Sequence, residues 1–171
     1  MARLRGDWPV ALRFPRTIRF DASDEHVFEA AATAGEWAVS GAFAFADADP
    51  ASLAGKARQA FASGFLGTTS FGWSTFVAVA EITPEQLEAV IDALAGHFVE
   101  RYGAPSPEAA CPAARAEAEF AASLCAHPIN TLLAVERAFG KDGVVERFRT
   151  ITPERAPGHA RIWTIVPDAE A

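Results

Sequence analysis

One segment of the chain has the residue types of an anion-binding loop. It is SGFLGTTSFG, residues 63–72, in which two glycines are followed by Thr68, Thr69 and Ser70. A phosphate loop joins a strand to the N-terminus of a helix, whose free N–H groups hold the anion. Here the segment follows an expected helix and precedes an expected strand, and it lacks Gly-Lys-Ser/Thr. Two interpretations stay open: a helix C-terminus followed by a turn, or a ligand-binding loop.

The cysteines and histidines form no catalytic or metal-binding pattern. Cys125 and His127 are two residues apart, but Cys125 is expected near a helix C-terminus, where the helix dipole raises the pKa of a thiol. On one helix, Cys111 and Cys125 would lie about 21 Å apart, too far for a disulfide. No two of the four histidines have metal-ligand spacing. We therefore predict no catalytic residue, no cofactor and no metal site.

Two arginines are candidates for binding an anion or a partner. Arg147 and Arg149 share one face of an expected strand, and the strand register described below sets Glu136 opposite Arg147 and Ala134 opposite Arg149. Arg149 is therefore expected to be solvated, to pair with a carboxylate elsewhere or to bind an anionic ligand, because guanidinium groups form bidentate bonds with such groups.

The aromatic content is high, with 13 phenylalanines and 4 tryptophans. Apolar surface that the helices and the sheet leave uncovered would mark an oligomer or partner interface. The alternative is that every aromatic residue belongs to the core. The candidate ligand or partner surface comprises Thr68, Ser70, Trp73, Arg147, Arg149 and Trp163.

Alternation of apolar and polar residues predicts the strands that must position these side chains. The strongest example is residues 36–45, where Trp37, Val39, Phe43 and Phe45 fall on one face. The other expected single strands cover residues 16–20, 26–30, 71–82 and 159–166.

The helices are expected between residues 50 and 127. An Asp49 cap before Pro50 suits the first, which would stop at Gly64. The residues TPEQ, 83–86, form a capping box for the second, whose apolar stripe continues to residue 102. The third begins near residue 106 or just after residue 112 and ends before His127.

A β-hairpin is expected around the Gly-Lys-Asp-Gly turn at residues 140–143. Its register pairs Arg137 with Glu146, Glu136 with Arg147, Val135 with Phe148 and Phe139 with Val144. Two opposite-charge pairs and two apolar pairs specify this register, because a slip by one residue would turn every side chain to the other face.

Composition and charge bound the protein class. The chain has 171 residues, half of them hydrophobic, and a formal net charge of −7, the wrong sign for neutralising nucleic-acid phosphates. No apolar run approaches the ~18 residues of a membrane span, and the first residues lack a secretory signal. We expect a cytoplasmic protein with no nucleic-acid or membrane partner. The fold class is α+β: one domain over residues 1–171, with residues 1–12 loosely ordered, and a mostly antiparallel sheet of about seven strands with about three helices packed on it.

Three stretches resemble a bacterial family of conserved hypothetical proteins, a domain of unknown function that covers nearly the whole chain. They are RTIRFDASD (residues 16–24), GEWAVSGAFAF (35–45) and ASGFLGTTSFGWSTF (62–76). The resemblance implies a bacterial protein and assigns no activity, cofactor or functional residue.

Two functional hypotheses follow from the residues. The first is a non-catalytic accessory or binding domain that self-associates or docks on a protein partner. The second is a small enzyme or small-molecule carrier with an apolar pocket, polarised by Arg149 or a histidine, that takes an apolar or anionic ligand.

Overall fold

The computed structural model describes residues 12–18, 27–155 and 161–167, and for residues 152–155 and 161–167 it describes the backbone alone. The expectation of a loosely ordered N-terminus falls almost entirely outside these residues. In chain order the elements are β1 (Leu12–Thr17), β2 (Ala38–Val39), η3 (Ala42–Phe45), η4 (Pro50–Ser52), α1 (Gly55–Ser63), β3 (Phe65–Gly67), β4 (Trp73–Ser74), β5 (Phe76–Ile82), α2 (Pro84–Tyr102), α3 (Pro107–Ser123), β6 (Leu132–Gly140), β7 (Gly143–Arg155) and β8 (Arg161–Pro167).

These strands form two antiparallel sheets. The larger has the order β1-β5-β6-β7-β8, and the smaller has the order β2-β3-β4. The predicted α+β class is confirmed, with the strands shared between two sheets. In the described residues, no helix is long and apolar enough to cross a membrane.

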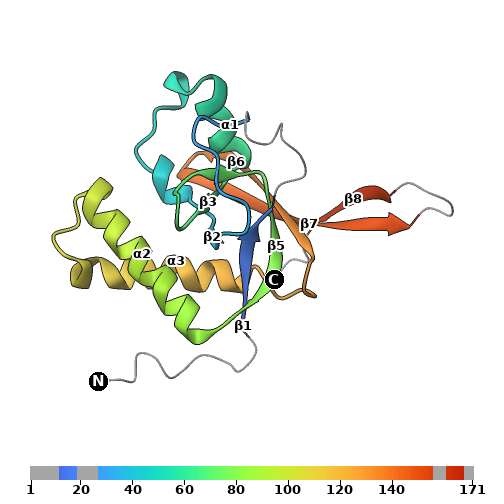
Figure 1. Cartoon of the computed structure of the whole chain (residues 1–171). Helices are drawn as coiled ribbons and strands as arrows, with labels where there is room; N and C mark the ends of the chain where they lie inside the picture. Colours follow the sequence, from blue (N-terminus) through green and yellow to red (C-terminus); the bar gives the residue numbers. More distant parts are fainter. Residues whose placement is uncertain (1–11, 19–26, 156–160, 168–171) are drawn as a thin grey trace.

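The small sheet packs against the large sheet. Val77, Val79, Leu133 and Val135 of the large sheet pack against Phe65 of the small one. On the other side, α2 and α3 enclose a second cluster with β1 (Figure 1). The Arg115 guanidinium joins the two helices through two bonds to the Glu88 carboxylate, at 3.0 and 3.2 Å. The β7–β8 ribbon extends away from this body (Figure 1).

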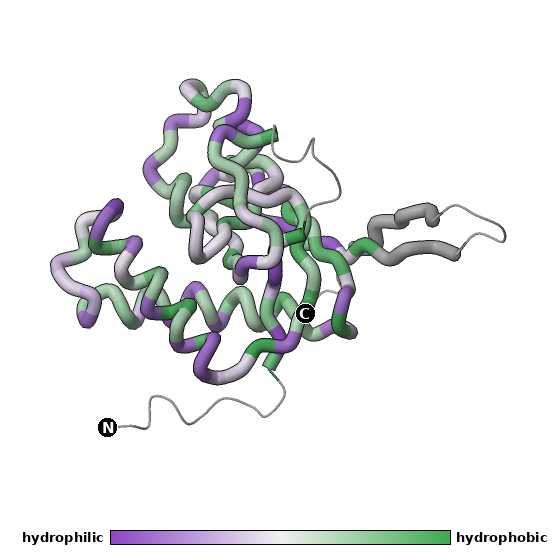
Figure 2. The backbone as a smooth tube through the Cα atoms, viewed as in Figure 1, coloured by the Kyte–Doolittle hydropathy of each residue, from purple (hydrophilic) through white to green (hydrophobic). Residues whose placement is uncertain are grey.

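Helix α2 forms as its sequence predicts. The Thr83 hydroxyl accepts a bond from the Gln86 N–H, and the Gln86 side chain accepts one from the Thr83 N–H, which completes the capping box. Hydrophilic and hydrophobic positions are interleaved along the helix (Figure 2), and the apolar ones are buried. The helix ends at Gly103, whose φ of 76° is the left-handed conformation that glycine adopts at low cost.

The predicted strand over residues 36–45 is largely wrong. Only Ala38–Val39 pair as β2, and the chain then turns at Gly41 (φ 81°) into η3. A Cβ at Gly41 would lie 2.7 Å from Leu66 and 2.9 Å from Trp73, so this tight turn requires glycine. The turn places the Phe43 and Phe45 rings beyond the sheet, although their spacing is that of a strand.

Four other predicted boundaries also change. The strand expected over 26–30 is absent from its described part, 27–30, which forms bends. The strand expected over 71–82 starts only at Trp73, because Phe71 adopts a left-handed φ of 55°, and it divides into β4 and β5, which join different sheets. The first predicted helix divides into η4 and α1, since Gly55 has a φ of 60°. Strand β1 starts at Leu12, four residues before its predicted start.

The β6–β7 hairpin has the predicted register. Arg137 pairs with Glu146, Glu136 with Arg147, Val135 with Phe148 and Phe139 with Val144. The third helix begins at its first predicted position, with the Ser106 hydroxyl capping it. Strand β8 covers Arg161–Pro167, close to the predicted 159–166.

A buried arginine joins four separate parts of the fold. The Arg137 side chain is fully buried, and its Nε donates to Glu146 at 2.8 Å. Its other nitrogens donate to the Phe61 carbonyl at the end of α1, at 3.0 Å, and to the Ser40 carbonyl before η3. Burial lowers the pKa of this guanidinium, whereas Glu146 raises it. Arg137 therefore fixes α1 and the segment leading to η3 against the hairpin.

We predict that Arg137→Met lowers the free energy of unfolding by about 3–5 kcal/mol, because it leaves Glu146 and two buried carbonyls without their donor. Arg147→Met, on the exposed face of β7, should change it by less than about 0.5 kcal/mol. Urea unfolding followed by tryptophan fluorescence measures both. A loss of less than about 1 kcal/mol for Arg137→Met would show that this network is not structural.

Candidate functional site

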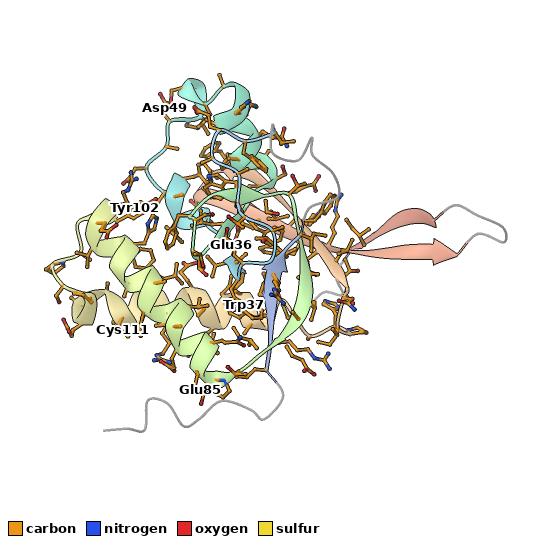
Figure 3. All side chains as sticks on the ribbon, viewed as in Figure 1. Glu36, Trp37, Asp49, Glu85, Tyr102 and Cys111 are labelled. Carbon is orange, nitrogen blue, oxygen red and sulfur yellow. The ribbon has the colours of Figure 1, made fainter. Side chains whose placement is uncertain are left out.

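The glycine- and hydroxyl-rich loop does bind an anion, and that anion is the chain's own Glu36 carboxylate. Its Oε1 accepts bonds from the backbone N–H groups of Thr69 (2.8 Å) and Ser70 (2.9 Å). Its Oε2 accepts bonds from the Ser70 hydroxyl (2.6 Å) and the Thr33 N–H (2.7 Å). Glu36 is 7% exposed and lies near the centre of the molecule (Figure 3).

Glu36 therefore occupies the position that an external anion would need. A Cβ on Gly67 would approach Glu36 Oε1 to 2.3 Å, so this glycine lets the carboxylate lie against the strand. The Glu36 backbone also bonds to Thr17 at the end of β1, through its N–H and its carbonyl. The loop thus has an internal ligand, which favours the turn interpretation for its role.

The predicted site residues in and next to this loop also make contacts within the fold. Thr68 is buried, and its hydroxyl donates to the Trp37 carbonyl at 3.0 Å. Trp73 packs on the Phe45 ring, with 5.2 Å between centroids. Thr68 also lines a recess of about 140 Å³ next to Trp37, which lies between β1 and α2 (Figure 3). That volume is below the usual range for small-molecule sites, roughly 300–1,000 Å³.

The other predicted site residues lie on the large sheet and do not join Thr68, Ser70 and Trp73. Arg147 and Arg149 are on the outer face of the hairpin, where Arg147 is exposed and Arg149 half-buried. Glu136 forms an ion pair with Arg149, its diagonal neighbour, although it lies directly opposite Arg147. Trp163 pairs with Pro153 through its backbone, and its side chain is outside the described residues.

The cysteines and histidines with described surroundings are placed for packing. Cys125 is 2% exposed, and burial raises the pKa of its thiol to about 12. The His97 ring stacks on Phe71 at 3.8 Å between centroids, and burial together with Arg101 lowers its pKa. In the described ranges, no group of three or more His, Cys, Asp or Glu side chains could hold a metal ion.

A pocket of about 440 Å³ lies where η3, α3 and the β6–β7 turn meet. Its size is within the range of small-molecule sites. Phe139 stacks on Phe61 at 4.2 Å and 7°, which fixes one wall. Phe43 makes an edge contact with Tyr102 at the end of α2 (Figure 3), which fixes another. The lining residues are Ala42, Phe43, Phe45, Ala46, Ala48, Glu117, Phe139, Gly143 and Val144.

The carboxylate of this pocket belongs to Glu117 on α3. One helical turn further on, Phe120 contacts Phe148 of β7, so this side of α3 follows the inner face of the hairpin. Burial and the nearby Glu146 raise the pKa of Glu117. In the part of the chain that the structure describes, Glu117 has no hydrogen-bond or ion-pair partner, while Glu146 is held by Arg137.

Comparison with known proteins identifies the family. The model of DUF6505, a family of unknown function, matches residues 12–162. The chain belongs to this family. No curated protein and no solved structure matches it. The predicted resemblance to an uncharacterised conserved domain is thereby confirmed, and the match spans both Glu36 and the Glu117 pocket.

Neither carboxylate is among the site residues predicted from the sequence of this DUF6505 member. Glu117 lies at helical spacing from Ala114 and Ala121, two residues of the buried α3 stripe, and this spacing was the available signal. Glu36 was hidden because residues 36–45 were read as a strand. The predicted polarising groups are elsewhere: Arg149 is on the outer face, and the pocket lining includes no histidine.

We predict that Glu36→Gln destabilises the fold by about 3 kcal/mol or more, because two or more charge-assisted bonds are lost and an amide NH₂ must face other donors. Glu29→Gln, on an exposed residue nearby, is the matched control and should have little effect. Urea unfolding of both variants tests this. Equal stability of the two would contradict the role given to Glu36.

We predict that Glu117→Gln raises the melting temperature at pH 7. A carboxyl group whose pKa is raised by folding stabilises the fold while protonated, and this contribution is lost as the pH rises through the raised value. The advantage of the variant should therefore shrink as the pH falls from 7 through the raised pKa, and should be gone below 4.5, the ordinary pKa of the group. The charged neighbours are Glu146 and its partner Arg137. Melting curves between pH 7 and pH 4 would refute this if the difference were constant.

Proposed function

We propose that this protein is a non-catalytic binding domain that holds a small, largely apolar molecule in the Glu117 pocket. The observation that carries the proposal is the pocket itself, whose size and phenylalanine lining are typical of small-molecule sites. Its walls come from η3, α3 and the β6–β7 turn, and Arg137 fixes two of these elements relative to one another.

We propose that the domain is non-catalytic. The internal hydrogen bonds of its charged groups and the raised pKa of its buried thiol support this. The Glu36 and Arg137 side chains are bonded within the fold. Burial raises the pKa of the Cys125 thiol to about 12, so it is not a thiolate at neutral pH. Both cysteines are free, which fits a reducing compartment and the expected cytoplasmic location.

Docking to a protein partner or self-association is the second candidate, and its support is less specific. Large exposed apolar side chains exist in the described ranges, but they belong to α2, α3, the α3–β6 connection and β7. They are Tyr102, Phe120, Ile129 and Val145. Val145 is the most exposed, at 56%.

We predict that Nile red, a neutral apolar dye, binds wild-type protein with an increase in fluorescence, and that Ala46→Trp abolishes this increase. Ala46 lines the pocket and is exposed, so an indole there blocks the opening without replacing a core residue. The matched control is Ala51→Trp on η4, an exposed alanine outside the pocket, which should bind the dye like wild type.

Thermal unfolding of both variants accompanies the titration, so that loss of binding is separated from loss of fold. A dye signal that survives in Ala46→Trp, or the absence of any signal in wild type, would overturn the proposed function.

A further inference from the structure

The Glu117 pocket combines three aromatic rings with one carboxylate that has no positive partner among the described residues. Phe43, Phe45 and Phe139 supply the rings. The faces of such rings attract cations, and a carboxylate among them adds a full opposite charge. A group with both an apolar body and a positive end would satisfy both parts of the lining.

The charges around the pocket argue against an anionic ligand. The charge of Glu146 acts on Glu117, and Glu146 Oε2 accepts a bond from Arg137 Nε at 2.8 Å. Arg137 also lies 5.9 Å from the Phe45 ring centroid, and its charge is already paired with Glu146. An anionic ligand, which is among the ligands predicted from the sequence, would be repelled by the Glu117 carboxylate.

We propose that the ligand is a small organic cation, a protonated amine carried on an apolar body, with its ammonium group on Glu117 and its body between Phe43 and Phe139. This inference rests on the proposed function, because it names the ligand class of that pocket. The net charge of −7 further favours the approach of a cation. Phe139 has one face covered by Phe61, which leaves its other side for the ligand.

The test uses three ligands that share a phenyl group and differ in charge: 2-phenylethylamine, 2-phenylethanol and phenylacetate. Their displacement of Nile red from the intact protein at pH 7.5 gives relative affinities. We expect 2-phenylethylamine to bind at least about tenfold more tightly than 2-phenylethanol, and phenylacetate to bind most weakly.

Glu117→Gln should reduce the preference for the amine to near unity while 2-phenylethanol still binds, which also shows that the pocket is intact. Glu119→Gln is the matched control, because Glu119 is exposed on the same helix. This variant changes the net charge by the same amount and should retain the preference for the amine. Phe139→Leu should weaken the amine about twofold to fivefold more than it weakens the alcohol.

Equal displacement by all three ligands in wild type, or an amine preference that survives Glu117→Gln, would overturn the inference. Neither result would touch the proposed function, because Nile red would still bind and be displaced. Failure of the dye to bind in the pocket at all would instead overturn both.

Discussion

The fold depends on a buried charge, the Arg137 guanidinium, that bonds to three separate segments. It lies on the inner face of the β6–β7 hairpin and bonds to Glu146, the end of α1 and the Ser40 carbonyl. A buried charge is tolerated only when its donors are satisfied, so these partners must hold their positions together. The same constraint places η3 beside the hairpin turn, and this juxtaposition creates the Glu117 pocket.

Glu36 has the equivalent role at the other end of the small sheet. Its carboxylate receives backbone and hydroxyl donors from two segments, and its backbone is bonded to Thr17 of β1. The loop thus uses the chemistry of an anion site to close the fold. A loop of this composition is therefore a poor guide to function unless the groups that its N–H donors face are known.

The two buried carboxyl-bearing regions differ in one respect that matters for function. Glu36 is surrounded by donors, whereas Glu117 is half-buried among phenylalanine rings with another carboxylate nearby. Proteins satisfy buried charges where stability is the only requirement. A carboxylate that lacks a partner at the edge of an apolar pocket lowers stability, and the cationic ligand that we propose would neutralise it.

The sequence by itself determined the elements whose signals are local. The capping box of α2, the start of α3 and the register of the β6–β7 hairpin each depend on residues within one element or one turn. The capping box and the register were predicted correctly, and α3 starts at the first of its two predicted positions. The alternation in residues 36–45 was equally clear, yet Gly41 turns the chain there because Leu66 and Trp73 occupy the space beside it. The partners of Glu36 and Arg137, and the pocket around Glu117, were decided only by the tertiary structure. The Arg137 bonds alone join residues up to 97 positions apart, and no local pattern records which distant carbonyl, N–H group or ring will meet a given side chain.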